Sequence, residues 1–305
     1  MIEIRQIAKS FGDIRALAGV DFTVNEGEIF GLLGPNGAGK TTTISIIAGL
    51  LAADSGSVRV SGMDIRKEGL RVRRMLGVVP QEIALYDELT GRENLHFWGG
   101  LYGLSGKRLR EEAGRVLDLV GLADRADDPV REYSGGMKRR INLSAGLIHR
   151  PKVILLDEPT LGIDPQARLN ILDIIRDGVS EGMTAIYTTH YLEEAEKLCD
   201  RIAIIDRGKI LAQGTLGELV KLAGEGNVVT VTGAFSREQA KALLAGVAIE
   251  HIEDGSLRML VPGQAELGGA LGRLFSAGLA IGEVSIQKPS LEGVFIKLTG
   301  RELRD

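Results

Sequence analysis

The glycine-rich segment 34–41 is the sequence feature that most constrains the fold. It reads Gly34, Pro35, Asn36, Gly37, Ala38, Gly39, Lys40 and Thr41, and it fits the pattern G-x-x-x-x-G-K-[ST] at every specified position. The apolar run 29–33 before it predicts a buried strand, and residues 42–48 after it have the apolar spacing of a helix that faces a core. Strand, glycine loop and helix form the context in which this pattern binds phosphate.

The residues of this loop indicate how phosphate binds. Glycines let backbone N–H groups turn inward and approach an anion closely, and the helix N-terminus adds partial positive charge. Lys40 is placed to reach the β- and γ-phosphates of a nucleotide, and Thr41 to put its hydroxyl on Mg²⁺. Thr42 belongs to the same predicted nucleotide site. An ordinary glycine turn is the alternative, and it is the weaker one because Lys-Thr and both flanks fit.

Composition narrows the class of protein. With 305 residues the chain holds one large domain, or a large and a small one. The formal net charge of −4 gives no global attraction to nucleic acid, and the basic run 66–75 is read as a solvated helix face. A single cysteine, Cys199, excludes an internal disulfide and fits a reducing compartment. No secretory leader or uncharged apolar run of about 18 residues is present, so we expect a soluble or peripheral protein.

The pattern along the chain predicts an α/β domain followed by a smaller one. Two strands, 2–7 and 20–24, joined through 9–12, indicate an antiparallel piece beside the nucleotide site. Further strands are expected at 57–60, 76–80, 152–156, 184–189, 201–205 and 209–214. From about 82 to 150 the pattern becomes helical, with a capping box at Thr90–Glu93. We therefore predict a P-loop core with an antiparallel β-subdomain and a helical subdomain over residues 1–222.

The remaining residues indicate a separate small domain. Residues 224–227 look like a linker. The expected elements after it are strand 228–232, helix 236–245, strands 248–252 and 256–261, helix 265–277, strand 281–286 and a last helix at 291–298. This βαββαβ order is ferredoxin-like, and we assign residues 227–305 to an α+β accessory or regulatory domain. Stabilising a dimer, regulating the enzyme and binding a small effector are all open to it, because fold alone does not choose.

Two carboxylates follow the apolar strand 153–156. In an open α/β sheet, ligands sit outside the carboxyl ends of the strands. Asp157 is placed there to hold Mg²⁺, directly or through water, and Glu158 to accept a proton from an attacking water or to orient it. An acidic turn before Pro159 is the alternative, and the phosphate loop upstream makes it the weaker one.

A second anion-binding motif lies at 133–137. Ser134 is a helix N-cap, and with Gly135 and Gly136 it offers a hydroxyl, backbone N–H groups and a helix dipole to an anion. In this order and spacing, the segment from Tyr133 to Met137 resembles the Leu-Ser-Gly-Gly-Gln signature of the nucleotide-binding subunits of ATP-binding-cassette (ABC) transporters. The resemblance covers residues 1 to about 220. It implies hydrolysis of ATP with Mg²⁺, and a head-to-tail pair of chains in which each closes the other's ATP.

The same resemblance assigns roles to four further residues. Gln81 matches the glutamine that senses Mg²⁺ and water and relays to the membrane subunit. His190 matches the switch histidine that contacts the γ-phosphate, and Asp164 matches the loop that crosses the dimer interface. Phe11 occupies the place of the aromatic residue that stacks on adenine, although a core role for its ring stays open.

The segments 34–43, 133–140, 157–160 and 289–295 are typical of the drug-resistance branch, which is similar to the daunorubicin-exporter ATPase. That branch implies export of a drug-like, lipid or polysaccharide cargo through a separate membrane permease, at the cytoplasmic face of the cell membrane and without nucleic acid. The resemblance implies that the helical region 82–150 provides the docking groove. Its aromatic residues either line that groove or pack the subdomain: Tyr86, Phe97, Trp98 and Tyr102. An importer ATPase and a soluble non-transport ABC ATPase remain alternatives.

Overall fold

The computed structural model describes residues 1–223, 227–288 and 290–299. These form two compact units, the first comprising Met1–Thr215 and the second beginning at Leu216. The boundary falls before helix α8 (Leu216–Ala223), whereas the sequence places it after this helix, because α8 packs against α11 (Leu291–Thr299) of the second unit. The predicted linker residues 224–226, Pro289 of the tail segment, and residues 300–305 lie outside the described residues.

A six-stranded sheet forms the centre of the first unit, with the order β10-β9-β3-β8-β7-β6. Its strands are β3 (Ile29–Leu33), β6 (Leu76–Val79), β7 (Val153–Asp157), β8 (Thr184–Thr189), β9 (Arg201–Asp206) and β10 (Lys209–Gly214). All are parallel except β10, which pairs antiparallel with β9. The strands β3, β7 and β8 are buried along their whole length, which explains the apolar runs 29–33, 153–156 and 185–187 within them.

The two faces of this sheet pack against different helices. Leu155 belongs to a hydrophobic cluster with Ile44 and Ile47 of α1 (Lys40–Ile47). Ile154 and Leu156 point to the opposite face, where they join a cluster with α6 (Pro165–Ser180). This alternation follows from the two-residue period of a strand. Because β3, β7 and β8 are parallel, their carboxyl ends lie at one edge of the sheet.

A second, antiparallel sheet has the order β2-β1-β4-β5 and packs against the other side of α1. Its strands are β1 (Ile2–Phe11), β2 (Ile14–Val24), β4 (Ser55–Val60) and β5 (Met63–Asp64). The strands β1 and β2 are longer than predicted, and the turn lies at residues 12–13 rather than 9–12. Asp54 accepts hydrogen bonds from Lys9 Nζ and Ser10 N. These bonds hold the polar end of β1, which the sequence pattern assigned to the turn.

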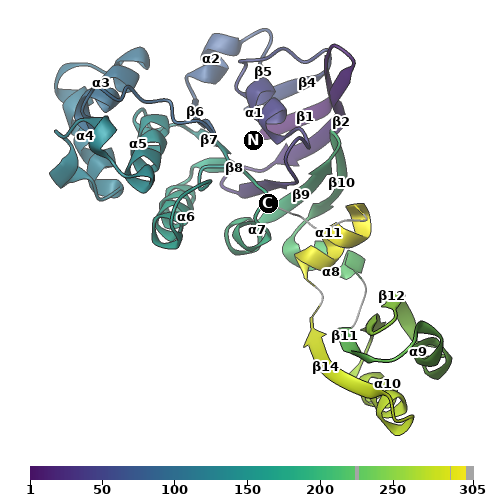
Figure 1. Cartoon of the computed structure of the whole chain (residues 1–305). Coiled ribbons are helices and arrows are strands. Elements are labelled where there is room, and N and C mark those ends of the chain that lie inside the picture. Colours follow the sequence, from purple (N-terminus) through teal and green to yellow (C-terminus); the bar gives the residue numbers. More distant parts are fainter. Residues whose placement is uncertain (224–226, 289, 300–305) are drawn as a thin grey trace. The chain divides into compact units, whose positions relative to one another are not determined.

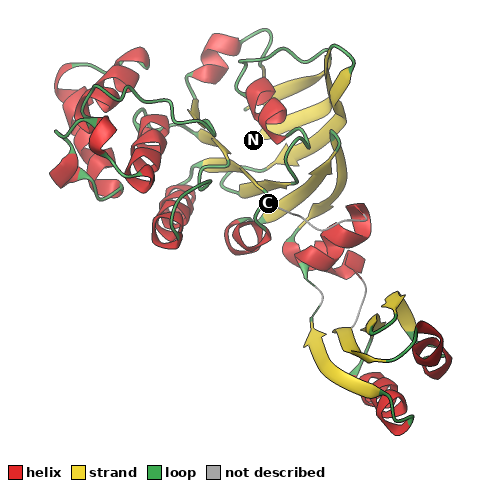
Figure 2. Cartoon of the chain, viewed as in Figure 1, coloured by secondary structure: helices red, strands yellow, loops and turns green. Residues whose placement is uncertain are grey.

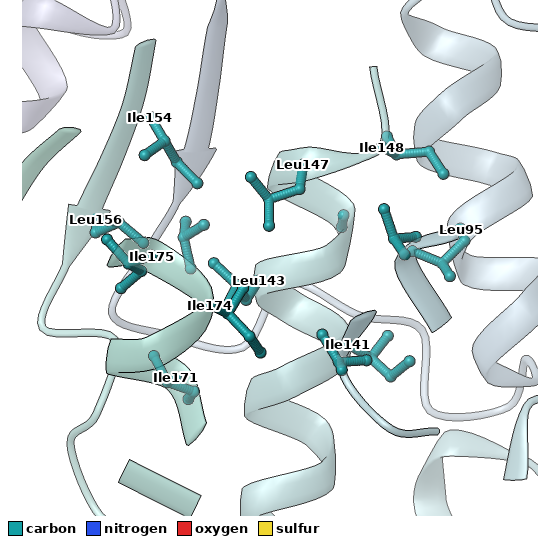
Figure 3. Packing of buried hydrophobic residues seen from close by; sticks show 14 of the residues in the cluster. Leu95, Ile141, Leu143, Leu147, Ile148, Ile154, Leu156, Ile171, Ile174 and Ile175 are labelled. Carbon is teal, nitrogen blue, oxygen red and sulfur yellow. The ribbon is translucent and has the colours of Figure 1, made fainter. Parts of the chain in front are cut away.

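The helices α3 (Gly91–Leu101), α4 (Gly106–Leu119) and α5 (Gly135–Leu147) form the predicted helical region. The capping box is confirmed, because Thr90 Oγ1 accepts from Glu93 N while Thr90 N donates to the Glu93 carboxylate. Helix α5 packs on both sides, with Ile141 towards Leu95 of α3 and Leu143 towards Ile174 of α6 (Figure 3). This double packing holds the N-terminus of α5 in a defined position.

The second unit, whose elements are labelled in Figure 1, has the predicted βαββαβ order, and Figure 2 shows its helices in red and its strands in yellow. Its elements after α8 are β11 (Asn227–Ala234), α9 (Arg237–Leu243), β12 (Ala248–Glu253), β13 (Ser256–Val261), α10 (Gln264–Ser276), β14 (Ala280–Gln287) and α11. The four strands form an antiparallel sheet in the order β12-β13-β11-β14. The short helices α2 (Gly69–Arg73) and α7 (Leu192–Leu198) complete the first unit. Across the described ranges, we find no helix with the length and apolar character needed to cross a membrane.

Candidate active site

The loop between β3 and α1 requires glycine at two positions. A Cβ atom on Gly34 would lie 2.2 Å from the carbonyl oxygen of Ile205. Gly39 has φ 107°, and a Cβ atom there would lie 2.6 Å from Leu17 Cδ2. Neither backbone position accommodates a side chain, so the chain passes tightly around the start of α1. The helix begins at Lys40, with its first backbone N–H groups at the loop.

Lys40 is buried at the start of this helix, with 5% of its surface exposed. Its Nζ donates to the carbonyl oxygens of Gly34 at 2.6 Å and Pro35 at 3.1 Å. The same nitrogen lies 2.9 Å from Glu158 Oε1. A buried ammonium group needs such partners, because an unpaired charge is costly away from water.

Thr188 holds the two carboxylate residues at the end of β7. Its hydroxyl donates to Asp157 Oδ1 at 2.7 Å and accepts from the backbone N–H of Glu158 at 3.0 Å. Glu158 itself has φ 45°, a left-handed conformation that is uncommon for a residue with a side chain. Such local strain persists only where surrounding contacts hold it, and it is concentrated at functional sites. Thr188 could not be predicted from the sequence, because a threonine at a strand end has no distinctive pattern.

The carboxylate of Glu158 lies between two basic side chains. One oxygen contacts Lys40 Nζ, and the other is 3.1 Å from His190 Nδ1. Burial raises the pKa of Glu158, but the hydrogen bonds from His190 and Lys40 outweigh burial, and the net pKa lies below its usual value. Glu158 is therefore ionised, and the histidine Nδ1 carries the hydrogen that it donates.

Lys40 and Glu158 border one cleft with a volume of about 430 Å³, whose lining, among the described residues, does not include His190 or Asp157. Its lining consists of Phe11, Ala16, Asn36, Gly37, Gly39, Lys40, Thr41, Thr42, Gln81 and Glu158. The structure thus brings together the predicted loop, the predicted glutamine and the predicted carboxylate. Phe11 lies here with 50% of its surface exposed, rather than in the core. The Nζ of Lys9 is 5.6 Å from the centre of its ring.

A second group of predicted residues lies at two helix N-termini. Ser134 caps α5 by accepting from Met137 N at 3.3 Å, and Asp164 caps α6 by accepting from Ala167 N at 2.9 Å. The two caps are neighbours, since a Cβ atom on Gly136 would lie 3.5 Å from Asp164 Oδ2. Within the described residues, the lining of the cleft includes neither Ser134 nor Asp164. The chain therefore carries its predicted site residues in two separate groups.

Arg139 joins two segments whose proximity no sequence pattern predicts. This α5 side chain is buried, and its guanidinium group donates to the carbonyl oxygens of Gln81 and Leu161. Burial lowers the pKa of Arg139. Three basic residues follow Met137 in the sequence, and which of them is buried depends on the face of α5 that packs against the rest of the unit. Burial of the Glu194 carboxylate could not be predicted either, because it depends in the same way on how α7 packs.

Known proteins resemble this chain over its length. Residues 17–161 match the family model described as "ABC transporter". The linearmycin resistance ATP-binding protein of Bacillus subtilis is 42% identical over 313 residues, covering 100% of both chains. The daunorubicin/doxorubicin resistance ATP-binding protein of Streptomyces peucetius is 41% identical and covers 100% of this chain and 94% of its own.

The chain belongs to the family of ABC transporter ATP-binding proteins. The Nod factor export ATP-binding protein I of a Rhizobium species is also similar, at 38% identity, with 99% of this chain and 98% of that protein covered. As a member of this family, the chain is an ATPase that binds ATP.

Solved structures show the same fold for the ATPase part. An ATP-binding subunit of an ABC transporter has a TM-score of 0.67 and 30% identity, covering 73% of this chain and 93% of its own. A dimeric ATP-binding cassette in a post-hydrolysis state, bound to ADP and Pi, has a TM-score of 0.65 and 26% identity. That match covers 71% of this chain and 99% of the cassette.

Proposed function

We propose that this chain is the ATP-hydrolysing subunit of an exporter, working as a pair of chains beneath a separate membrane permease at the cytoplasmic face of the membrane. The observation that carries the hydrolytic part is the position of Glu158, an ionised carboxylate held between Lys40 and His190 at the phosphate loop. The names of the drug-resistance and Nod factor export relatives support the direction of transport. The resistance names support a drug-like cargo, and the lipid and polysaccharide cargoes stay predictions from the sequence.

In this proposal, the loop N–H groups and Lys40 bind the β- and γ-phosphates, and Phe11 stacks on adenine. The γ-phosphate competes with Glu158 for Lys40. The carboxylate is then free on one oxygen to orient the attacking water, while His190 Nδ1 holds the other. Lys40 and the loop stabilise the charge that develops on the phosphoryl oxygens.

The donor set around the cleft fits Mg²⁺. This ion prefers a few protein oxygens together with substrate phosphates. Thr41 and Gln81 line the cleft, and Asp157 lies beside Glu158 with its Oδ1 already oriented by Thr188. These three residues would hold the ion, which neutralises phosphate charge when it is bound. No cluster of three or more His, Cys, Asp or Glu side chains that could hold a metal occurs among the described residues. Phosphate oxygens of the nucleotide would supply further ligands, as they commonly do for Mg²⁺.

The two separate groups of site residues support a two-chain enzyme. Ser134, Gly135 and Gly136 offer an anion site that the cleft of their own chain does not use. In a head-to-tail pair, this segment covers the ATP at Lys40 of the other chain, and Asp164 lies at the interface. The solved dimeric cassette with ADP and Pi supports this arrangement.

A mixing experiment tests the pairing. We expect Lys40→Ala and Ser134→Arg each to abolish turnover alone, because each ruins both sites of a homodimer. Mixed together, they form heterodimers with one intact site, so part of the ATPase activity returns. If the two variants form heterodimers and the mixture is still as inactive as each variant alone, the sites are not shared between chains.

An apolar groove supports the docking of a permease. It has a volume of about 290 Å³ and lies between the first unit's central sheet and its helical region. Its lining consists of Ala48, Leu50, Arg73, Leu76, Val78, Pro80, Ala84, Trp98, Tyr102, Asn142 and Ala145. Of the four predicted aromatic residues, Trp98 and Tyr102 line this groove, whereas Tyr86 and Phe97 pack edge to face with 49% and 39% of their surfaces exposed.

A further inference from the structure

Glu194 is a buried carboxylate close to the active site that the mechanism above does not use. It lies in the first turn of α7, four residues after His190, and 2% of its surface is exposed. Its Oε1 accepts from the hydroxyl of Thr160 at 2.7 Å. Its Oε2 accepts from Tyr187 at 2.8 Å and from Thr189 at 2.7 Å.

A cation completes the surroundings of this carboxylate. Arg168 Nε of helix α6 lies 3.4 Å from Oε1 and forms an ion pair with it. The same guanidinium group lies 4.5 Å from the ring centre of Tyr191, whose backbone N–H donates to Thr189 Oγ1. Burial, together with Glu194, keeps the pKa of Tyr187 well above its ordinary value, so this hydroxyl stays a donor. Buried hydrogen-bond networks of this kind fix the geometry of the segments that they join.

The segments joined by Glu194 are those that carry the catalytic side chains. Thr160 is two residues after Glu158, and Thr189 directly precedes His190. Arg168 belongs to the first turns of α6, whose N-cap is Asp164. One carboxylate therefore connects the strand end at Glu158, the strand end at His190 and the helix that presents Asp164.

We propose that Glu194 is a positioning residue for ATP hydrolysis, which sets the contact between Glu158 and His190 by holding Thr160 and Thr189. The proposal rests on the roles given to Glu158 and His190 above. Glu194 touches neither the nucleotide cleft nor the reacting atoms, and it acts through the two threonine hydroxyls. Its effect falls on turnover more than on binding, because the loop 34–41 that holds the phosphates is not among its partners.

The variant Glu194→Gln tests this directly. An amide group at this position turns an NH₂ towards hydroxyl donors or towards Arg168, so the network cannot be satisfied as before. We expect kcat to fall about tenfold to 100-fold, the loss that a misplacement of roughly 1 Å causes, while the dissociation constant for ATP changes less than about threefold. The control is Glu193→Gln, which removes an exposed carboxylate from the same helix and should keep the parental kcat.

A double variant separates positioning from general loss of structure. If Glu194 acts through His190, then Glu194→Gln combined with His190→Ala has the kcat of His190→Ala alone, within about twofold. If the double variant instead loses the product of the two single-variant losses in kcat, the proposal is wrong. It is also wrong if Glu194→Gln folds and keeps the parental kcat. If His190→Ala keeps the parental turnover, the role proposed above for His190 is wrong, and the inference about Glu194 fails with it.

Two further variants apply if Glu194→Gln does not fold. Thr189→Val removes one donor to the carboxylate while keeping a β-branched side chain, and we expect kcat to fall with ATP affinity retained. Thr189→Ser restores the hydroxyl and should recover most of the lost turnover. Equal, parental kcat in both variants would contradict the proposal.

Discussion

Lys40 and Glu158 form a buried ion pair at the phosphate loop, with 2.9 Å between Nζ and Oε1. Each group neutralises the other in a place with little water, so neither is easily removed alone. The pair also links two motifs that lie more than a hundred residues apart in the chain. Binding of a triphosphate at Lys40 and release of one Glu158 oxygen are therefore a single event in the proposed mechanism.

Removing Lys40 tests the phosphate-binding part of this account. In Lys40→Ala the loop loses its charged donor, and a charge-assisted hydrogen bond contributes about 1.5–3 kcal/mol. We expect ATP to bind about tenfold to 100-fold more weakly in calorimetry. Lys138→Ala is a suitable control, since that lysine pairs with Asp87 outside the cleft. Unchanged affinity in Lys40→Ala would exclude the loop as the phosphate site.

His149 predicts a pH dependence of stability that is separate from catalysis. Its ring stacks on Tyr102 with 3.5 Å between centroids, its Nε2 contacts Leu76 O at 3.1 Å, and burial lowers its pKa to about 4. Because the unfolded chain binds the proton more tightly, the neutral ring stabilises the fold fully above about pH 6.5, and this contribution is lost as pH falls towards 4.

The variant His149→Phe keeps a stacked ring but cannot be protonated. Its free energy of unfolding should therefore fall less between pH 6.5 and 4 than that of the parental protein, by on the order of 1–2 kcal/mol after allowance for partial exposure, and its Tm should fall less in parallel. Thermal unfolding monitored by circular dichroism gives the comparison. Parallel Tm curves for the two proteins over this range would show that His149 does not titrate as described.

The lining of the apolar groove predicts which exposed leucine contributes to permease binding. Leu50 lines the groove with 73% of its surface exposed, whereas Leu70 is equally exposed, at 74%, but lies outside the groove lining. We expect Leu50→Asp to reduce co-purification with the co-expressed permease, and Leu70→Asp to leave it unchanged. Equal recovery of the permease with both variants would place the docking surface elsewhere.

Local patterns predicted much of this structure. The phosphate loop, the capping box at Thr90 and the βαββαβ order depend on neighbouring residues, and their periodicity or spacing is visible in the chain. The boundary at α8 could not be found in this way, because it depends on packing against α11 at the other end of the second unit.

The candidate site likewise contains residues that a local sequence motif predicts and residues that only their contacts in the fold reveal. Lys40 and Glu158 could be predicted because each belongs to a motif with its own signature. Thr188, Arg139 and Glu194 belong to no such pattern, and their roles depend on partners between five and sixty residues away in the chain. Distant pairs of this kind become visible only once the strands are placed side by side.

The most direct test of the account is the behaviour of Glu158→Gln with Mg²⁺ and ATP. An amide in place of the carboxylate keeps the shape of the side chain but cannot take a proton, so we expect turnover to fall by at least about 100-fold. Light scattering after size exclusion, with the bound nucleotide identified, should then show a dimer that retains unhydrolysed ATP. Hydrolysis at the parental rate, or a monomer with ATP bound, would contradict the central claim.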